Sequence, residues 1–322
     1  MNAVDGSDHY ERAIEGTTIA RVLICTLLNL SPGPAPSLLV IVLDTNPHAW
    51  ALLGPTLPLS KAIANILVFI NAHLAVNNAN QVAVVASHSH RAVWLYPRSP
   101  SSSEDVEMED DDPTNLDDAN KYRLFALIEN SLLTSLRSLI SATTESDIST
   151  TNTTQMAGAL TLALSYINKA TITYSDTGNS SKAAPTSNET TDGSSGLQSR
   201  ILVVSVSGDL AHQYIPIMNT TFAAQRLRIP IDILKLAGDT VFLQQASDAT
   251  KGIYMQLRSP EGLLQYLMMA FLPDQMSRKH LVAPTQEVVD FRAACFCHRK
   301  VVDVGFVCSI CLSSMYTLLK FK

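Results

Sequence analysis

Short apolar runs alternate along this chain with longer stretches in which apolar residues recur every three or four positions. The first run extends from Leu38 to Leu43, is rich in β-branched residues and leads directly into Asp44. A continuous run of this kind, bounded by turn residues, predicts a strand that is buried on both faces. Four further strands are predicted at Gln81 to Ser87, Arg91 to Tyr96, Arg200 to Val206 and Ile231 to Leu236. The first two of these are joined by a short loop and are expected to form a hairpin at a sheet edge.

The intervals between these runs carry helical periodicity. One helix is predicted after Ser60, with an apolar face made by Ile63, Ile66, Leu67, Ile70 and Leu74. A strongly amphipathic helix is predicted from Lys121 to Ile140, and its inward face is expected to hold Leu124, Phe125, Ile128, Leu132, Leu136, Leu139 and Ile140. Shorter helices are predicted near residues 157–169 and 262–272. This alternation predicts an α/β domain with a doubly wound, mostly parallel sheet and helices on both faces.

Composition separates a main domain from less regular segments. We predict an N-terminal tail at residues 1–36, the α/β domain at 37–274, and a linker with a short zinc-binding segment at 275–322. Two flexible insertions are predicted inside the domain, at residues 97–118 and 171–199. The first contains seven acidic residues among the nine from Glu104 to Asp112, which is typical of a solvated loop or, alternatively, of a tail that binds a basic partner.

Charge and apolar content limit the classes of function. The 322 residues carry a formal net charge of −6, which argues against strong direct nucleic-acid binding because such proteins present a basic face. The apolar stretch from Val22 to Leu28 is too short to cross a membrane, so no transmembrane helix and no membrane partner are expected. The acidic N-terminus is unlike a secretory signal, which predicts a reducing compartment where cysteines are thiols or metal ligands.

Carboxylates follow the ends of three predicted strands, at Asp44, Asp209 and Asp239. Because the carboxyl ends of parallel strands share one edge of the sheet, these groups could hold a divalent cation, or they could cap helices and shape turns. The residues two and four positions after Asp44 are Asn46 and His48, and His48 is a poor ligand for magnesium. We therefore predict a degenerate, inactive cation site at Asp44, Asn46, His48 and Asp209, and we expect no magnesium.

The sequence contains no arrangement typical of an enzyme. A glycine-rich phosphate loop after the first strand, a nucleophile elbow and a histidine pair at the helical spacing of metal ligands are all missing. His88 and His90 lie two residues apart in a hairpin loop and are expected to be exposed. Asn46 cannot supply the proton that catalysis by an Asp44 nucleophile would need. We expect no enzymatic activity.

The cysteines are concentrated near the C-terminal end. Four of the five lie in the pattern Cys295-x-Cys297-x10-Cys308-x2-Cys311. A Cys-x-x-Cys turn lets two thiolates bind one zinc ion, so Cys308 and Cys311 are the strongest candidates. Zinc needs four ligands, and Cys295 and Cys297 could complete the set, with His298 as a substitute. The alternative is that one or two of these cysteines are ordinary buried thiols.

With these residues assembled, the chain resembles the family of the smaller von Willebrand factor A-type subunits of the general transcription and repair factor TFIIH. The resemblance covers about residues 37 to 314 and is carried by LLVIVLDTNPHAW (38–50), VAVVASHS (82–89), RILVVSVSGD (200–209), LLQYLMMAFLPDQ (263–275) and VDFRAACFCHRKVVDVGFVCSICLSS (289–314). It implies a von Willebrand A-like fold, a nuclear protein and a non-catalytic scaffold. The implied partner is the larger von Willebrand A/zinc-finger subunit and, through it, the TFIIH helicases, in transcription initiation and nucleotide excision repair.

Two departures from the family's wider pattern bear on the metal sites. Metal-binding members of the fold use Asp-x-Ser-x-Ser, whereas this chain keeps Asp44 but has Asn46 and His48 at the serine positions. Family members continue past the Cys308 pair to a second Cys-x-x-Cys, whereas this chain runs from Met315 to Lys322. Either the cysteines at 295 and 297 complete the zinc site or the zinc segment is incomplete. A cation-dependent ligand-binding module of the same fold is the alternative function.

Overall fold

A computed structural model describes most of the main domain and parts of the C-terminal segment. The described residues are 35–98, 122–150, 153–179, 197–208, 210–238, 240–282, 289–295, 298, 300–307 and 314–315. The chain divides into two compact units, residues 1–35 and 36–322, and all the elements described below belong to the second unit.

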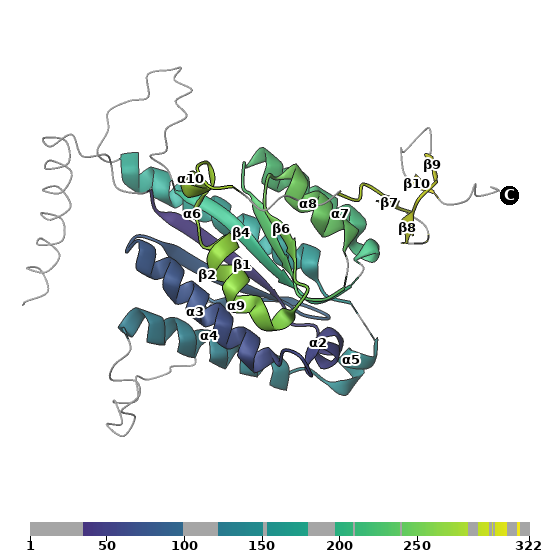
Figure 1. Ribbon diagram of the computed structural model, residues 1–322, viewed down its shortest axis with the longest axis horizontal. Helices are drawn as coiled ribbons and strands as arrows, with labels where there is room; N and C mark the ends of the chain where they lie inside the picture. Colours follow the sequence, from purple (N-terminus) through teal and green to yellow (C-terminus); the bar gives the residue numbers. More distant parts are fainter. Residues whose placement is uncertain are drawn as a thin grey trace, which may run out of the picture. The chain divides into compact units, whose positions relative to one another are not determined.

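A six-stranded sheet forms the centre of this unit (Figure 1). Its strand order is β3-β2-β1-β4-β5-β6, and every neighbouring pair is parallel except the edge hairpin of β2 and β3. The strands are β1 Ser37–Asp44, β2 Gln81–Ser87, β3 Ala92–Tyr96, β4 Gln198–Ser205, β5 Ile231–Lys235 and β6 Tyr254–Gln256. This arrangement confirms the predicted mostly parallel sheet and the predicted edge hairpin.

Helices cover both faces of the sheet (Figure 1). On one face lie α2 Pro47–Leu53, α3 Leu59–Val76, α4 Arg123–Ser141 and α9 Leu263–Tyr266, which continues as a π-helix over Leu267–Phe271. On the other face lie α6 Met156–Asn179, α7 Tyr214–Arg226 and α8 Val241–Ala249. Short helices complete the set: α5 Glu145–Thr150, α10 Gln275–Arg278, and the 3₁₀ turns Ala211–Gln213 and Pro260–Gly262.

The two helical layers explain the unbroken apolar run of β1. Successive side chains of a strand point to opposite faces of the sheet. Leu39, Ile41 and Leu43 therefore pack with α3, α4 and α9, whereas the alternate residues, beginning at Leu38, pack with α6, α7 and α8. Both sets are buried, which explains why every position from Leu38 to Leu43 is apolar.

Helix α3 is, by length and composition alone, apolar enough to cross a membrane. Its five predicted apolar residues, from Ile63 to Leu74, are nevertheless all buried in the same core cluster as β1. The helix packs on β2 and α9. We therefore interpret it as a core helix, because an amphipathic face buried against a sheet accounts for its composition.

Two helices differ from their predicted extents. In α4, Leu124 and Ile140 are 37% and 47% exposed rather than buried, because this helix packs on the five-residue strand β3 and its ends extend beyond that strand. Helix α6 continues to Asn179, into the predicted flexible insertion at 171–199. The hydroxyl groups of Thr171 and Thr173 donate hydrogen bonds to the main-chain carbonyls four residues earlier, at 2.8 and 3.0 Å. These polar side chains are therefore compatible with a helix.

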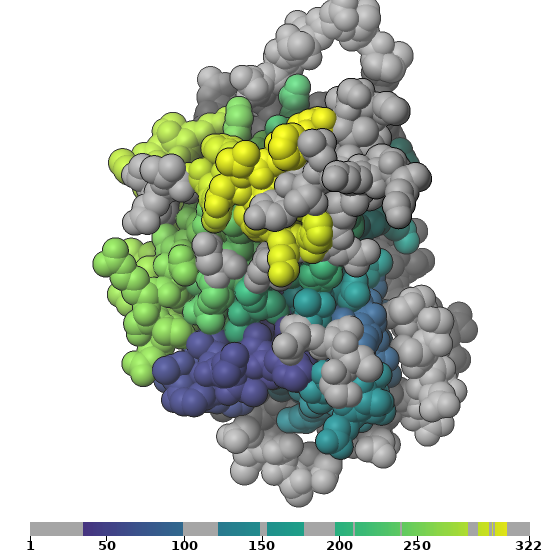
Figure 2. Space-filling view, turned by 90° about the vertical axis from the view of Figure 1, so that its right-hand side faces the viewer, coloured from purple at the N-terminus to yellow at the C-terminus, as the bar shows by residue number. Residues whose placement is uncertain are grey.

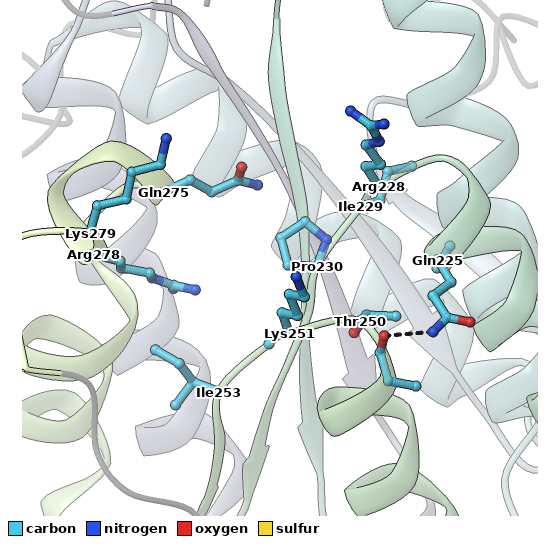
Figure 3. Close-up of a pocket in the computed structure, with 13 residues that line it drawn as sticks. Gln225, Arg228, Ile229, Pro230, Thr250, Lys251, Ile253, Gln275, Arg278 and Lys279 are labelled. Carbon is cyan, nitrogen blue, oxygen red and sulfur yellow. Dashed lines mark hydrogen bonds between the residues drawn. The ribbon is translucent and has the colours of Figure 1, made fainter. Parts of the chain in front are cut away.

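The segment after residue 274 begins as part of the main domain. Helix α10 lies across the start of β5 from the ends of α7 and α8 (Figure 3). Further on, β7 Ala293–Ala294 pairs with β8 Val301–Val302, and β9 Phe306–Val307 pairs with β10 Ser314–Met315. Gln245 of α8 donates to the carbonyls of Asp290 and Arg292, at 2.8 and 3.0 Å. These bonds place the start of the C-terminal segment against α8, and Figure 2 shows the described part of this segment in yellow.

Candidate functional site

The carboxyl end of β1 places Asp44, which is completely buried, next to the residues that follow β4. Its Oδ2 accepts hydrogen bonds from the main-chain N–H groups of Val206 (3.0 Å) and Ser207 (2.7 Å). Its Oδ1 accepts one from the N–H of Asn46 (3.1 Å). Because a carboxylate oxygen has two lone pairs, Oδ2 is saturated and one acceptor position remains on Oδ1. Asp44 therefore fastens the end of β1 to the end of β4.

Asn46 and His48 belong to the predicted degenerate cation site and lie at the start of α2. The Oδ1 of Asn46 accepts the N–H of His48 at 3.2 Å and caps α2. The amide NH₂ of Asn46 consequently points the other way and donates to Ser207 Oγ at 3.0 Å. The Nε2 of His48 lies 2.8 Å from the carbonyl oxygen of Ile148. Asn46 thus turns a donor toward Ser207, where a cation would need an oxygen ligand.

Lys235, at the end of β5, brings a fully buried ammonium group to this same edge. Its Nζ donates to Ser205 Oγ at 2.9 Å and to the main-chain carbonyl of Ser207. Ser207 also donates its N–H to Asp44, so one residue links a buried carboxylate to a buried ammonium. Asp209 and Asp239, which we predicted beside Asp44, lie outside the described residues.

His88 is buried, with only 2% of its surface exposed, so the prediction of an exposed loop histidine was wrong for this residue. Its Nδ1 lies 3.0 Å from both Oγ1 and the carbonyl oxygen of Thr45, and its Nε2 lies 3.0 Å from Thr143 Oγ1. The turn after α4 covers the hairpin loop, which the local sequence cannot reveal. Burial lowers the pKa of His88 below its ordinary value, so the imidazole is neutral at pH 7. His90 is exposed, as predicted.

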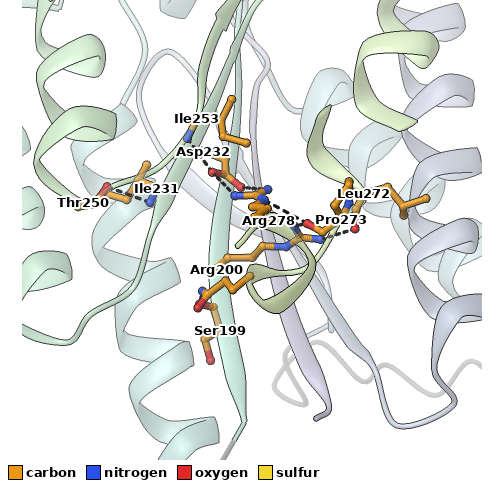
Figure 4. A network of polar contacts seen from close by, with 10 residues as sticks. Ser199, Arg200, Ile231, Asp232, Thr250, Ile253, Leu272, Pro273 and Arg278 are labelled. Carbon is orange, nitrogen blue, oxygen red and sulfur yellow. Dashed lines mark hydrogen bonds and ion pairs between the residues drawn. The ribbon is translucent and has the colours of Figure 1, made fainter. Parts of the chain in front are cut away.

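A second buried network lies at the opposite, amino-terminal edge of the sheet (Figure 4). Arg200 of β4 donates to the carbonyls of Pro273 (2.7 Å) and Leu272 (3.2 Å). Asp232 of β5 accepts two hydrogen bonds from the guanidinium of Arg278, at 2.8 and 2.6 Å. Burial and, secondarily, the charge of Arg278 lower the pKa of Arg200 to about 10, so Arg200 remains protonated at pH 7. This network fixes α10 to the sheet.

The predicted zinc segment is described only in part. Cys295 is buried, and its Sγ lies 3.4 Å from Nδ1 of His298. Tetrahedral zinc with a sulfur ligand at about 2.3 Å and a nitrogen ligand at about 2.1 Å would hold those two atoms roughly 3.6 Å apart, so the pair fits zinc. Cys297, Cys308 and Cys311 lie outside the described residues. Among the residues that are described, no three His, Cys, Asp or Glu side chains gather closely enough to hold a metal ion.

Several residues of these networks were missed in the sequence. Asp232 and Lys235 interrupt a run that otherwise predicts a buried strand, and Arg200 stands at the start of another. A charged residue inside such a run is costly to bury unless it is paired, and that was the signal available. Ser207 offered no comparable signal, because its role depends on the approach of Asp44 and Lys235 from two other strands.

Together these observations define a doubly wound α/β domain whose carboxyl edge is held together by hydrogen bonds within the protein. Residues 36–320 match the family model described as Transcription factor Tfb4. The chain belongs to the Transcription factor Tfb4 family.

Curated relatives and a solved structure agree with this assignment. The general transcription and DNA repair factor IIH subunit tfb4 of Schizosaccharomyces pombe is 46% identical over 278 residues, which cover 86% of this chain and 84% of that protein. The TFB4 subunit of Yarrowia lipolytica is 37% identical, over 98% of this chain and 88% of its own length. The crystal structure of the TFIIH p34 N-terminal domain matches with a TM-score of 0.59 and 50% identity, and the match covers 73% of this chain and 97% of that one.

Proposed function

We propose that this chain is a non-catalytic structural subunit of the TFIIH core complex, acting in the nucleus in RNA polymerase II transcription initiation and nucleotide excision repair. Membership of the Tfb4 family and the names of the relatives support the complex and its two processes. The observation that carries the structural role is the use of Asp44. Its oxygens accept hydrogen bonds from three main-chain N–H groups, and Ser207 links it to the buried Lys235. These contacts support a structural role for this carboxylate.

The partner that we propose is the larger von Willebrand A/zinc-finger subunit, which in turn connects this chain to the TFIIH helicases. The contact would bury an apolar, shape-complementary surface, as stable subunit interfaces do. Helix α2 supports this proposal, because it follows Asp44 directly and carries Leu52, whose side chain is 87% exposed. Docking of a partner on this helix would remove the exposed leucine side chain from water, which favours association.

We further propose that the C-terminal segment binds zinc. Cys295 and His298 lie at a separation suitable for two zinc ligands, and Cys308 with Cys311 form a Cys-x-x-Cys turn. Cys297 is the remaining candidate ligand. When bound, zinc would crosslink a segment too short to build a core of its own. The role of this metal is structural in our proposal, and no magnesium is involved.

Affinity purification of the tagged chain from nuclear extract at moderate salt tests the proposal. We expect the larger von Willebrand A subunit and the two helicases to be recovered. Leu52→Glu should weaken this recovery, whereas Val76→Glu, which changes a residue 67% exposed at the end of α3, should preserve it. Omitting magnesium and calcium, without a chelator that would also strip zinc, should have no effect.

Two results would contradict the proposal. If the tagged chain is recovered without other subunits, it is not part of the complex and the proposal is wrong. Recovery that requires magnesium would instead favour the alternative function, a cation-dependent ligand-binding module.

A further inference from the structure

A cavity of about 900 Å³ lies at the amino-terminal edge of β5 and β6, away from the edge that holds Asp44 (Figure 3). Helix α10 forms one wall, and the ends of α7 and α8 form the other. Ile229, Pro230 and Ile253 contribute buried apolar surface, and exposed basic side chains surround it. In Figure 3, Lys251 lies between Lys279 on one side and Arg228 on the other.

Two matched helix ends place cations at this cavity. After α7, Arg228 has a φ of 55°, and the N–H of the next residue bonds to the carbonyl of Ala224 at 2.9 Å. After α8, Lys251 has a φ of 58°, and the N–H of the next residue bonds to the carbonyl of Ser247 at 2.8 Å. Both are Schellman turns, in which the left-handed position is usually glycine. This chain has a long basic side chain at both positions in spite of the backbone cost.

The residue after Lys251 must be glycine, and its close contact with the sheet makes this wall of the cavity rigid. A Cβ on Gly252 would lie 1.9 Å from the carbonyl oxygen of Ile231, so this position presses directly on the first residue of β5. The close contact fixes the end of α8 against the sheet. Lys251 is therefore presented from a backbone that has little freedom to move.

Most cations of the cavity have no anionic partner in the part of the chain that the structure describes. Arg278 is the exception, since it is bonded to Asp232. Within the described residues, Arg228, Lys251 and Lys279 form no ion pair, and no aspartate or glutamate lines the cavity. The nearby helix C-termini favour positive charge, which accounts for tolerance of the cations there. Their charge remains available to a ligand from outside.

We propose that this cavity binds an acidic segment of a partner protein. Its carboxylates would form charge-assisted hydrogen bonds with Arg228, Lys251 and Lys279, and an apolar side chain would pack on Ile229 and its neighbours. A nucleic acid fits less well, because the lining has no aromatic residue on which a base could stack and the chain's net charge is −6. The proposal goes beyond the docking of α2 and does not depend on it.

Fluorescence anisotropy tests the proposal with the full chain and a labelled, short glutamate-rich peptide that contains leucine. The double variant Arg228→Gln/Lys279→Gln should weaken binding about tenfold, because both side chains are exposed and solvent screens each ion pair that it removes. The matched control Lys61→Gln/Lys169→Gln removes the same charge from exposed positions of α3 and α6 and should bind as the native chain does. A glutamine version of the peptide should not bind.

Lys251→Gly separates recognition from folding. Glycine favours the left-handed backbone at this position, so the melting temperature should stay the same or rise while peptide affinity falls. A structural role for the lysine would instead lower the melting temperature and leave binding intact, and that result would overturn the proposal.

Three other outcomes would also overturn it. Equal losses in the cavity variant and the matched control would show only general charge attraction. Tighter binding of a single-stranded oligonucleotide, lost in the cavity variant, would make the cavity a nucleic-acid site. Tighter peptide binding after neutralisation of the acidic block Glu104 to Asp112 would show that this chain's own segment occupies the cavity.

Discussion

Replacing Asp44 by alanine should destabilise the main domain by about 4 kcal/mol. The change leaves three buried main-chain N–H groups, those of Asn46, Val206 and Ser207, without their acceptor. Hydrogen bonds to a charged group contribute roughly 1.5–3 kcal/mol each, which gives an upper limit of about 4.5–9 kcal/mol for three. Part of this is offset because a buried carboxylate, costly to desolvate, is removed as well. Asp44→Asn keeps one acceptor oxygen and should cost roughly half as much.

Urea unfolding of the full chain, followed by circular dichroism, measures this change. For a domain of this size a loss of about 4 kcal/mol corresponds to a fall of roughly 8–16 °C in the melting temperature. Asp248→Ala, at an exposed position of α8, provides the matched control and should stay within about 0.5 kcal/mol of the native chain. Added magnesium should change neither the native chain nor the control. A loss below about 1 kcal/mol for Asp44→Ala would refute the reasoning, as would stabilisation by magnesium that Asp44→Ala abolishes.

Three further predictions follow from buried or metal-binding groups. Burial lowers the pKa of His73 from 6.5 to about 4, so its neutral form is stabilising above pH 6.5, and up to about 3 kcal/mol is lost as the pH falls to about 4. In urea unfolding, the free energy of unfolding that is lost between about pH 7.5 and about pH 4.5 should be smaller for His73→Leu than for the native chain. The exposed His280→Leu should lose as much as the native chain does. Arg278→Leu leaves the buried carboxylate of Asp232 without its ion-pair partner and should lower the free energy of unfolding in urea by about 3 kcal/mol. Replacing Asp232 as well should recover much of this loss, and no recovery would contradict the pairing. Cys308→Ser should lower bound zinc, measured by elemental analysis, and leave the main domain folded; Cys25→Ser should retain the zinc, and unchanged zinc in Cys308→Ser would refute the site.

The sheet could be predicted because burial on both faces leaves a pattern in every central strand. β1 is apolar at each position from Leu38 to Leu43, and the structure places helices on both sides of it. The helix from Leu59 to Val76 was equally clear, since its buried face repeats at the helical period. These patterns are local, so a single sequence is enough to reveal them.

The polar networks could not be predicted because they depend on which strands are neighbours. Lys235 pairs in register with Ser205 across β4 and β5, which are far apart in the sequence. Arg278 reaches Asp232 from a helix that we had placed in a linker. A charged residue within an apolar run shows that some partner is needed, but only the folded topology identifies the partner.

The prediction of the candidate cation site went only as far as its donor atoms. Replacement of two serines by Asn46 and His48 predicted a degenerate site, and that remains a prediction. The structure adds the direction of each group: the amide of Asn46 turns its nitrogen to Ser207, and its oxygen caps α2. Residue identity sets the available ligands, whereas their orientation depends on hydrogen bonds to distant residues.

The six-stranded sheet ends on each side in a short strand, β3 with five residues and β6 with three, whereas the two central strands, β1 and β4, have eight residues each. Each of these edge strands has a single strand partner among the described residues. Short edges offer little main chain for pairing with a strand of another molecule. Neighbours in a crowded assembly must therefore hold this domain through side chains and strand-end loops, and its geometry discourages polymerisation through the sheet.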